Sequence, residues 1–439
     1  MFKVLYGDII LKKGDLLMDM NNDLTWLKLD NAALIYPALL SKKIAPMFRL
    51  SVSLKENIDL NTLNMALINI MNRFPTFNFQ LKEGLFWCYF DKINNKPIIT
   101  GDYNNPLLRI NFKDNKYYMF RTRVYKNRIA VEIFHSLTDG TGGLTFLLTL
   151  TAEYLKLKYK IKIKYNDLIL NPNDKPNEEE YQDSFFRYAS KNGKLEKNHK
   201  AYHIKGIKEE DHLLNIITGK INISKLKKIS KQYNATITEF ITAIMIDSLY
   251  KISSKNNNRK PIMISIPINL RKIYYTKTLR NFSSYVNVGI KPTENGYSLQ
   301  DIINSIQKQM KDLTKEEVVN SKISANVALE RNIFIRIIPM FIKKHIMAYV
   351  GTKKGDNYIT TTFSNLGLVD LPEQMSEYVT DFNFILGKSK ITSGSVSAIG
   401  YKNTLYITFS RKIKESEFER IFFTTLVNMG LKVEIESNR

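Results

Sequence analysis

The chain has little of the material that builds disulfide-linked or metal-bound proteins. Its 439 residues include a single cysteine, Cys88, and five histidines. One cysteine excludes a disulfide framework and any zinc module that needs several thiolates. Because so few histidines leave little for a histidine-based site, we expect no bound metal.

Long apolar runs are also missing. No uninterrupted stretch reaches the roughly 18 apolar residues that a membrane-spanning helix needs. The nearest approach, residues 333–350, is interrupted by Arg336, Lys343, Lys344 and His345. The first residues lack the apolar stretch and the small-residue cleavage site of a secretory signal. These absences predict a cytoplasmic protein with no transmembrane segment.

Positive charge is abundant. Lys and Arg number 65 against 42 Asp and Glu, which gives a net charge of +23. Such a charge can attract nucleic acid, an anionic membrane or a phosphorylated cofactor, or it can simply belong to a solvated lysine-rich surface. We favour the solvated surface. Because no common nucleic-acid module is present, we expect no nucleic-acid partner; a binder of that kind would need a continuous basic groove.

Hydropathy patterns in the first half alternate between strand and helix. Residues 49–54 alternate polar and apolar side chains, as a half-buried strand does. Asp59 is a candidate N-cap for a helix that runs to Phe74 and stops at Pro75. Alternation returns at 76–81, so this region predicts strand, helix, strand.

The same pattern recurs in the second half after a polar break. Residues 171–180 hold two prolines and little apolar matter, which is typical of a linker. Beyond it, Thr236 or Thr238 can cap an apolar helix, and residues 261–268 predict a strand. We therefore expect an α+β protein with a domain at 1–165, a linker at 166–215 and a second domain at 216–439.

One segment carries candidate chemistry. Residues 128–135 predict a strand that ends at His135; Asp139 and Gly140 follow in a glycine-rich turn, and a helix begins beyond them. A histidine at the end of a strand is rigidly held and can act as a base. The positive end of the nearby helix favours a neutral ring. The alternative, from these residues alone, is a buried histidine followed by a helix cap.

The segment 134–140, Phe-His-Ser-Leu-Thr-Asp-Gly, resembles the His-x-x-x-Asp-Gly signature of the CoA-dependent acyltransferase superfamily. That superfamily includes chloramphenicol acetyltransferase, the BAHD plant enzymes and the condensation domains of nonribosomal peptide synthetases. Residues 267–271, 279–282 and 362–367 are similar to later segments of such proteins, above all of stand-alone bacterial alcohol acetyltransferase-like proteins. The resemblance implies two chloramphenicol-acetyltransferase-like α/β sandwich domains in a pseudo-dimer, with the active site in a tunnel between them.

The resemblance also implies roles for individual residues. His135 would be the general base, while Asp139 would orient the site structurally by pairing with Arg271. Ser364 and Asn365 would stabilise the oxyanion, and Gly140 would serve the turn. The first histidine of the two-histidine pattern is replaced by Phe134.

The implied function is transfer of an acyl group from acyl-CoA, as co-substrate, to a small-molecule alcohol or amine. No tightly bound cofactor is expected, and we expect a monomer. The alternative is a catalytically silent condensation-like scaffold that binds a partner protein or a lipid. Residues 331–350 alternate basic and apolar side chains in a helical pattern. We favour a core helix with one wet face for this segment; the alternative is that it contacts a membrane peripherally or covers a lipid-like acyl chain.

Overall fold

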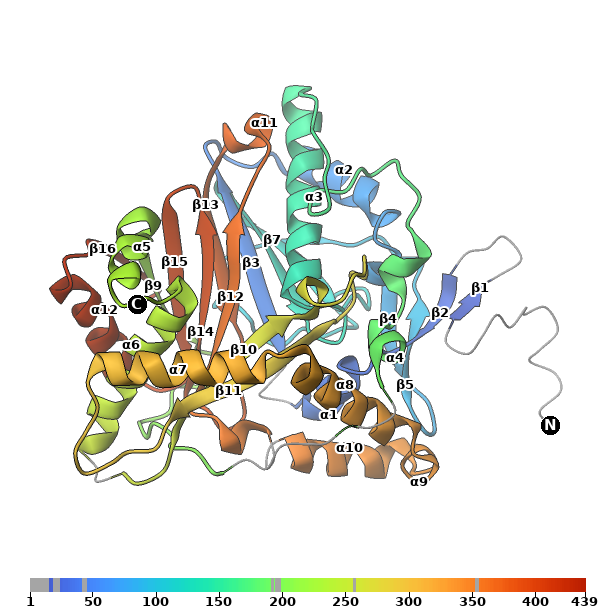
Figure 1. Cartoon of the computed structure of the whole chain (residues 1–439). Helices are drawn as coiled ribbons and strands as arrows, with labels where there is room; N and C mark the ends of the chain where they lie inside the picture. The colour runs from blue at the N-terminus through green and yellow to red at the C-terminus, as the bar shows by residue number, and fades with distance from the viewer. Residues whose placement is uncertain are drawn as a thin grey trace.

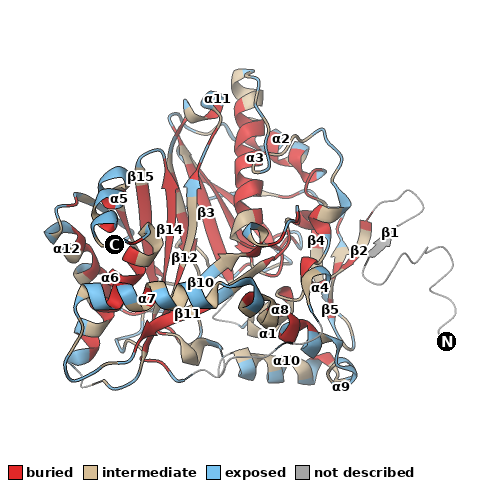
Figure 2. Ribbon diagram, viewed as in Figure 1, coloured by how far each residue is buried: buried red, intermediate tan, exposed pale blue. Residues whose placement is uncertain are grey.

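The computed structural model describes residues 16–18, 24–41, 46–190, 193, 199–255, 258–351 and 355–439. Within these residues the strands form one large sheet in each half of the chain and a smaller sheet at one side (Figure 1). Helices cover the outer faces of the two large sheets, and most strand residues are buried (Figure 2). The architecture is a mixed α/β fold of two sandwich-like halves, as expected from the sequence.

The first-half sheet has the strand order β13-β3-β8-β7-β6. Its members are β13 (Val379–Leu386), β3 (Met47–Leu54), β8 (Arg128–Phe134), β7 (Phe120–Tyr125) and β6 (Ile99–Gly101). The helices α2 (Leu60–Met71) and α3 (Gly140–Tyr159) pack together, and α3 contacts β3 and β8. Asp59 caps α2 as predicted, because its carboxylate accepts the backbone N–H of Thr62 at 2.7 Å.

The strand predicted at 76–81 is wrong in its first half. Residues Pro75–Asn78 form a 3-10 turn, and β4 (Phe79–Glu83) begins only afterwards. Pro75 fixes the first dihedral angle of the turn, and the N–H of Phe77 bonds the carbonyl of Phe74 at 3.0 Å. The apolar alternation reflects burial of Phe77 and Phe79 and not an extended backbone.

A buried ionic network lies within the first-half sheet. Asp102 contacts the guanidinium groups of Arg49, Arg123 and Arg128, and Glu132 contacts Arg49 and Arg123 as well. Burial acts to raise the pKa of Asp102, but the hydrogen bond and charge of Arg49, with the other arginines, hold that pKa at about 2. The network therefore keeps both carboxylates ionised inside the sheet.

The second-half sheet has the order β11-β10-β12-β14-β15-β9-β16. Its strands are β11 (Ser283–Ile290), β10 (Ile262–Asn269), β12 (Thr361–Val369), β14 (Gly394–Tyr401), β15 (Thr404–Arg411), β9 (Asn215–Asn222) and β16 (Val433–Ser437). The helix α6 (Ile237–Ser254) packs between α7 (Leu299–Leu313) and α12 (Glu417–Asn428). Thr236 begins α6 with a capping box completed by Glu239.

Strand β13 links the two halves. It follows β12 in the chain but pairs with β3 of the first-half sheet. Its other contacts are with the second half: Tyr406 donates to Asp381 at 3.0 Å, and Thr408 donates to Asn383 at 3.0 Å. The division at 165 and 216 stays a prediction, with the qualification that this strand of the later range completes the earlier sheet.

The helix predicted over 331–350 is divided in the structure. Helix α8 (Glu316–Arg331) ends where the predicted helix would begin. Beyond it, α9 (Ile333–Arg336) is a single turn, and α10 (Met340–Val350) starts after Pro339. A proline cannot continue a helix from the preceding turn because it lacks the backbone N–H, so the break falls there. Among the described residues, no helix combines the length and the apolar character needed to cross a bilayer.

Candidate active site

His135 is held at the end of β8 by contacts with the first half. Its backbone N–H donates to the carbonyl of Pro46 at 2.9 Å. The imidazole stacks on Tyr36, with ring centroids 4.5 Å apart and planes 19° apart, and meets Phe48 edge-on at 5.1 Å. Tyr36 begins the short helix α1 (Tyr36–Leu39). These two rings fix the plane in which the imidazole lies.

Asn281 determines which nitrogen of His135 carries the proton. The Nδ1 atom of His135 lies 3.2 Å from Oδ1 of Asn281. The Nδ2 group of Asn281 faces Oδ2 of Asp30 at 3.2 Å and the carbonyl of Ser136 at 3.4 Å. A carbonyl oxygen only accepts, so the amide N–H groups belong on that side and the amide oxygen faces the ring. The proton therefore lies on Nδ1, and Nε2 keeps its lone pair.

The resting imidazole is neutral. Burial lowers the pKa of His135 below its ordinary value, and the charge of Asp139 and the bond to Asn281 act in the opposite direction without cancelling it. The sequence predicted a neutral ring because of a helix N-terminus; in the structure the main cause is burial.

Asp30 holds the side-chain amide of Asn281 in place. Its carboxylate accepts the backbone N–H of Ala33 at 2.8 Å and lies 3.4 Å from Nε of Arg280. Arg280 is itself buried and donates to the carbonyl of Lys28 at 2.6 Å. Burial raises the pKa of Asp30, against the lowering effect of Arg280. The segment around Asp30 is thus fastened to the loop that carries Asn281.

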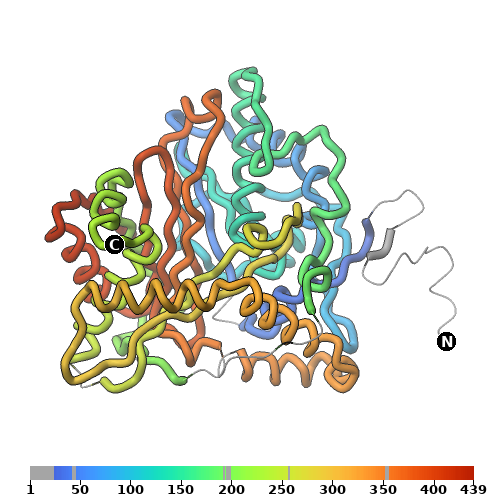
Figure 3. The backbone as a smooth tube through the Cα atoms, viewed as in Figure 1, coloured from blue at the N-terminus to red at the C-terminus, as the bar shows by residue number. Residues whose placement is uncertain are grey.

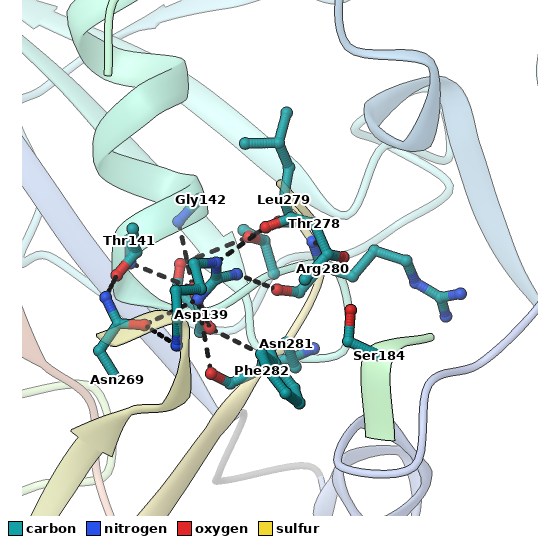
Figure 4. Close-up of polar contacts among 12 residues, drawn as sticks. Asp139, Thr141, Gly142, Ser184, Asn269, Thr278, Leu279, Arg280, Asn281 and Phe282 are labelled. Atoms are coloured by element: carbon teal, nitrogen blue, oxygen red, sulfur yellow. Dashed lines mark hydrogen bonds and ion pairs between the residues drawn. The ribbon is translucent and has the colours of Figure 1, made fainter. Parts of the chain in front are cut away.

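Asp139 joins the two halves at the start of α3 (Figure 4). Its Oδ1 accepts the backbone N–H groups of Thr141 and Gly142, both at 3.1 Å, and so caps the helix. Its Oδ2 accepts from Nη1 of Arg271 at 2.8 Å and from the N–H of Phe282 at 2.9 Å. First-half donors therefore occupy Oδ1, and second-half donors occupy Oδ2.

Arg271 braces the loop between β10 and β11. Besides Asp139, it donates to the carbonyl of Thr278 through Nε at 2.8 Å and to the carbonyl of Arg280 through Nη2 at 2.6 Å. In Figure 3 this yellow hairpin reaches from the second-half sheet to the start of α3. Asn269 adds a bond to Thr141 at 3.1 Å. The loop that carries Asn281 is therefore fixed against the first half.

The glycines after Asp139 serve close approach. A Cβ atom at Gly142 would lie 2.3 Å from the carbonyl oxygen of Leu279, and one at Gly140 would lie 2.8 Å from the side chain of Leu366. Neither glycine has a positive φ angle. Close neighbours therefore require glycine here: the Thr138 hydroxyl and the Leu279 carbonyl at Gly142, and the Leu366 side chain at Gly140.

Ser364 and Asn365 lie on β12 and line the same cavity as His135. The Nδ2 group of Asn365 donates to Thr238 at 3.1 Å, and its oxygen accepts the N–H of Gly367 at 2.9 Å. Gly367 has a φ of +80°, and the pairing of β12 with β14 shifts between Asn365 and Leu368. This irregular backbone holds the Asn365 amide in the turn and leaves Ser364 on the cavity wall.

The cavity at His135 lies between the halves and has a volume of about 400 Å³. Tyr36, Phe48 and His135 line it from the first half, and Asn269, Ser364 and Phe384 are among those that line it from later in the chain. Its size is within the range of small-molecule sites. A larger cavity of about 940 Å³ is lined by residues of the second half. Ser395 lines both cavities, but none of the predicted site residues lines the larger one.

Sequence reasoning missed the residues that orient the imidazole. Asn281 lay inside the segment 279–282, quoted only for its resemblance, and no local pattern assigned it a role. Asp30 lies in the segment 26–32, which also resembles the family but suggested no role for it, and Tyr36 had no signal. Their contacts with Asn281 and His135 depend on the fold. Among the described residues, no three His, Cys, Asp or Glu side chains are grouped as a metal site would require.

The fold is shared with solved structures of acetyltransferases and of condensation domains. The chain is similar to the TRI3 trichothecene 15-O-acetyltransferase from Fusarium sporotrichioides (TM-score 0.59, 10% identity, covering 96% of each chain). It is also similar to F. sporotrichioides TRI101, complexed with coenzyme A and T-2 (0.59, 8%, 93% of this chain and 99% of that chain). The first condensation domain of the CDA synthetase is a third such structure (0.56, 10%, 90% and 94%).

These likenesses establish the fold. No model of a known protein family matches the sequence, and no curated protein matches it.

Proposed function

We propose that the protein transfers an acyl group from acyl-CoA to an alcohol or amine, with His135 as general base. The observation that carries this proposal is the His135 ring itself. It is neutral, its proton is directed to Asn281, and it lines a cavity between the two halves. A buried histidine that only filled space would need neither the orienting amide nor the cavity.

The proposed reaction uses the free lone pair on Nε2. That nitrogen accepts the proton of the acceptor hydroxyl or amine as the acceptor atom attacks the thioester carbonyl carbon. The carbon–sulfur bond then breaks, and the imidazolium returns the proton to the departing thiolate. The ring ends neutral, and the products are the ester or amide and free CoA. General-base catalysis of this kind contributes about 10²–10⁴-fold to the rate.

Negative charge develops on the carbonyl oxygen during the attack. Ser364 supports the role of oxyanion donor because its side chain lines the same cavity as His135. Asn365 is the weaker donor of the two, because Thr238 and the N–H of Gly367 already engage its amide. We propose Asp139 and Arg271 as the structural pair that holds the two halves in register.

Basic side chains at the cavity support an anionic donor. Lys272, Lys388 and Lys390 line it, and they can meet the phosphates of CoA. The similar structure TRI101 was solved with coenzyme A. We propose acyl-CoA as a co-substrate that binds and leaves with each turnover.

The test is release of free thiol from acetyl-CoA and longer acyl-CoAs in the presence of varied alcohols and amines. We expect the wild-type chain to release thiol and His135→Ala to lose about 10²–10⁴-fold of that rate. His212→Ala is the matched control, because His212 is exposed and its ring pairs with the exposed Glu210. Turnover by His135→Ala at the wild-type rate would overturn the base assignment. No thiol release by the wild-type chain with any donor would favour the silent scaffold.

A further inference from the structure

The helices α9 and α10 expose apolar side chains, and α10 turns its two lysines inward. On α10 the outward positions are Phe341, Ile342, His345, Ile346, Tyr349 and Val350. The opposite side carries Met340, which is buried, and Lys343 and Lys344, which are partly buried. An ordinary surface helix shows the reverse arrangement. Figure 2 shows α9 and α10 along one edge of the molecule, largely in the tints of intermediate and exposed residues.

The exposed apolar surface continues beyond α10. On α9 and after it, Ile333, Phe334 and Ile337 are exposed, with Phe334 75% exposed. The turn between β4 and β5 (Cys88–Lys92) adds Leu85 and Trp87, with Leu85 68% exposed. We call these side chains the α9–α10 apolar face: Leu85, Trp87, Ile333, Phe334, Ile337, Phe341, Ile342, Ile346, Tyr349 and Val350.

Hydrogen bonds tie the turn to the helix. The N–H of Met340 donates to the carbonyl of Leu85 at 2.7 Å, and Nζ of Lys343 donates to the carbonyl of Phe86 at 2.7 Å. Lys344 pairs with Glu83, the last residue of β4. The lysines thus serve to fasten the turn, and the apolar side chains of both elements are left facing outward. Single exposed apolar residues are normal, but a contiguous group marks an interaction site.

The charge of this region indicates the partner. Residues 331–350 contain no aspartate or glutamate, and with Lys343 and Lys344 engaged at the turn, the exposed basic side chains of this segment are Arg331 and Arg336. Arg336 is exposed between Ile333 and Ile337. Aromatic rings, aliphatic side chains and basic groups on one surface match the headgroup boundary of an anionic bilayer. A second copy of the chain fits less well, because facing copies would bring these basic groups together.

We propose that the α9–α10 apolar face docks on the surface of an anionic lipid bilayer. Its apolar and aromatic side chains enter the headgroup boundary, and Arg331 and Arg336 meet the lipid phosphates. The opposite side of α10 reaches the cavity, because Ala348 lines it together with His135. Docking therefore places the cavity next to the membrane, separated from it by one helix.

The experiment is co-sedimentation of the full chain with vesicles, either of phosphatidylcholine alone or of phosphatidylcholine mixed with phosphatidylglycerol. We expect binding to the mixed vesicles and much weaker binding to phosphatidylcholine alone, with the difference reduced by salt. The test variant is Ile337→Ser with Phe341→Ser, whose side chains are 59% and 64% exposed. We expect it to bind the mixed vesicles about tenfold or more weakly.

The matched control is Ile207→Ser with Tyr275→Ser, two side chains outside the face that are 64% and 76% exposed. It should bind vesicles as the wild-type chain does, and thermal melting should find both variants folded. Equal vesicle binding by the test variant and the wild type would overturn the proposal. So would a wild-type chain that binds no vesicles but self-associates, or captures an acidic protein, through this face. The test measures no acyl transfer, so it stands apart from the proposed reaction.

Discussion

The side-chain oxygen of Asn281 lies 3.2 Å from Nδ1 of His135 and connects a residue of the first half to the hairpin of the second. The bond depends on Asp30 and the carbonyl of Ser136, which hold the amide N–H groups on the other side. The tautomer and the pKa of the His135 imidazole therefore depend on how the second-half hairpin contacts the first half.

Asn281→Asp and Asn281→Leu should move the pH profile of acyl transfer in opposite directions. The bond from Asn281 raises the pKa of His135, so its loss in Asn281→Leu lowers that pKa, and an added carboxylate raises it. Activity needs the neutral ring and is lost as the pH falls through the pKa. The acidic limb of kcat against pH should then shift to lower pH in Asn281→Leu and to higher pH in Asn281→Asp. Unmoved limbs with only a lower rate would indicate a purely structural role.

Asp139→Ala should reduce stability and activity together. The substitution leaves the largely buried guanidinium of Arg271 without its carboxylate and removes the N-cap of α3. We expect the free energy of unfolding to fall by about 3–5 kcal/mol. Urea titration of Asp139→Ala, Arg271→Leu and the double variant measures the coupling. We expect the double variant to cost less than the two single variants added together. Strict additivity would contradict a direct interaction.

Gly142→Ala should destabilise the protein strongly, because the new methyl group meets the backbone carbonyl of Leu279, which cannot move aside as a side chain can. Gly355→Ala is the control, since a Cβ atom there has no neighbour within 4 Å. Melting temperatures provide the comparison. Equal melting temperatures for the two variants would show that the halves lie farther apart at Gly142.

Asp102 should make the stability sensitive to acid. Its folded pKa of about 2 lies below its ordinary value of 3.8, so the stabilisation is complete above pH 3.8 and is lost as the pH falls toward 2. Asp102→Asn lacks this titration. The difference in unfolding free energy between wild type and variant, measured by urea titration, should shrink across that range. A constant difference would show that the carboxylate is not held ionised by its arginines.

Local signals predicted local structure. The caps at Asp59 and Thr236 could be identified because a cap and its helix are neighbours in the sequence. The strand prediction for 76–81 was wrong in its first half, because polar and apolar side chains can alternate along a 3-10 turn as they do along a strand. His135 and Asp139 could be predicted as site residues because they are neighbours within one short sequence motif. Asn281 and Tyr36 could not, because they meet His135 only in the folded chain. The outward orientation of α10 was also not predictable, since an amphipathic pattern does not say which face meets the protein.

Strand β13 has a consequence for the order in which the protein can form. In the sheet order it alone covers the outer side of β3, yet β3 is made early and β13 (Val379–Leu386) late in synthesis. Until most of the chain has left the ribosome, β3 has an open hydrogen-bonding edge that can pair with another chain. A fragment that stops at residue 165 keeps that edge permanently, and we expect it to aggregate where the full-length chain stays dispersed, as light scattering would measure.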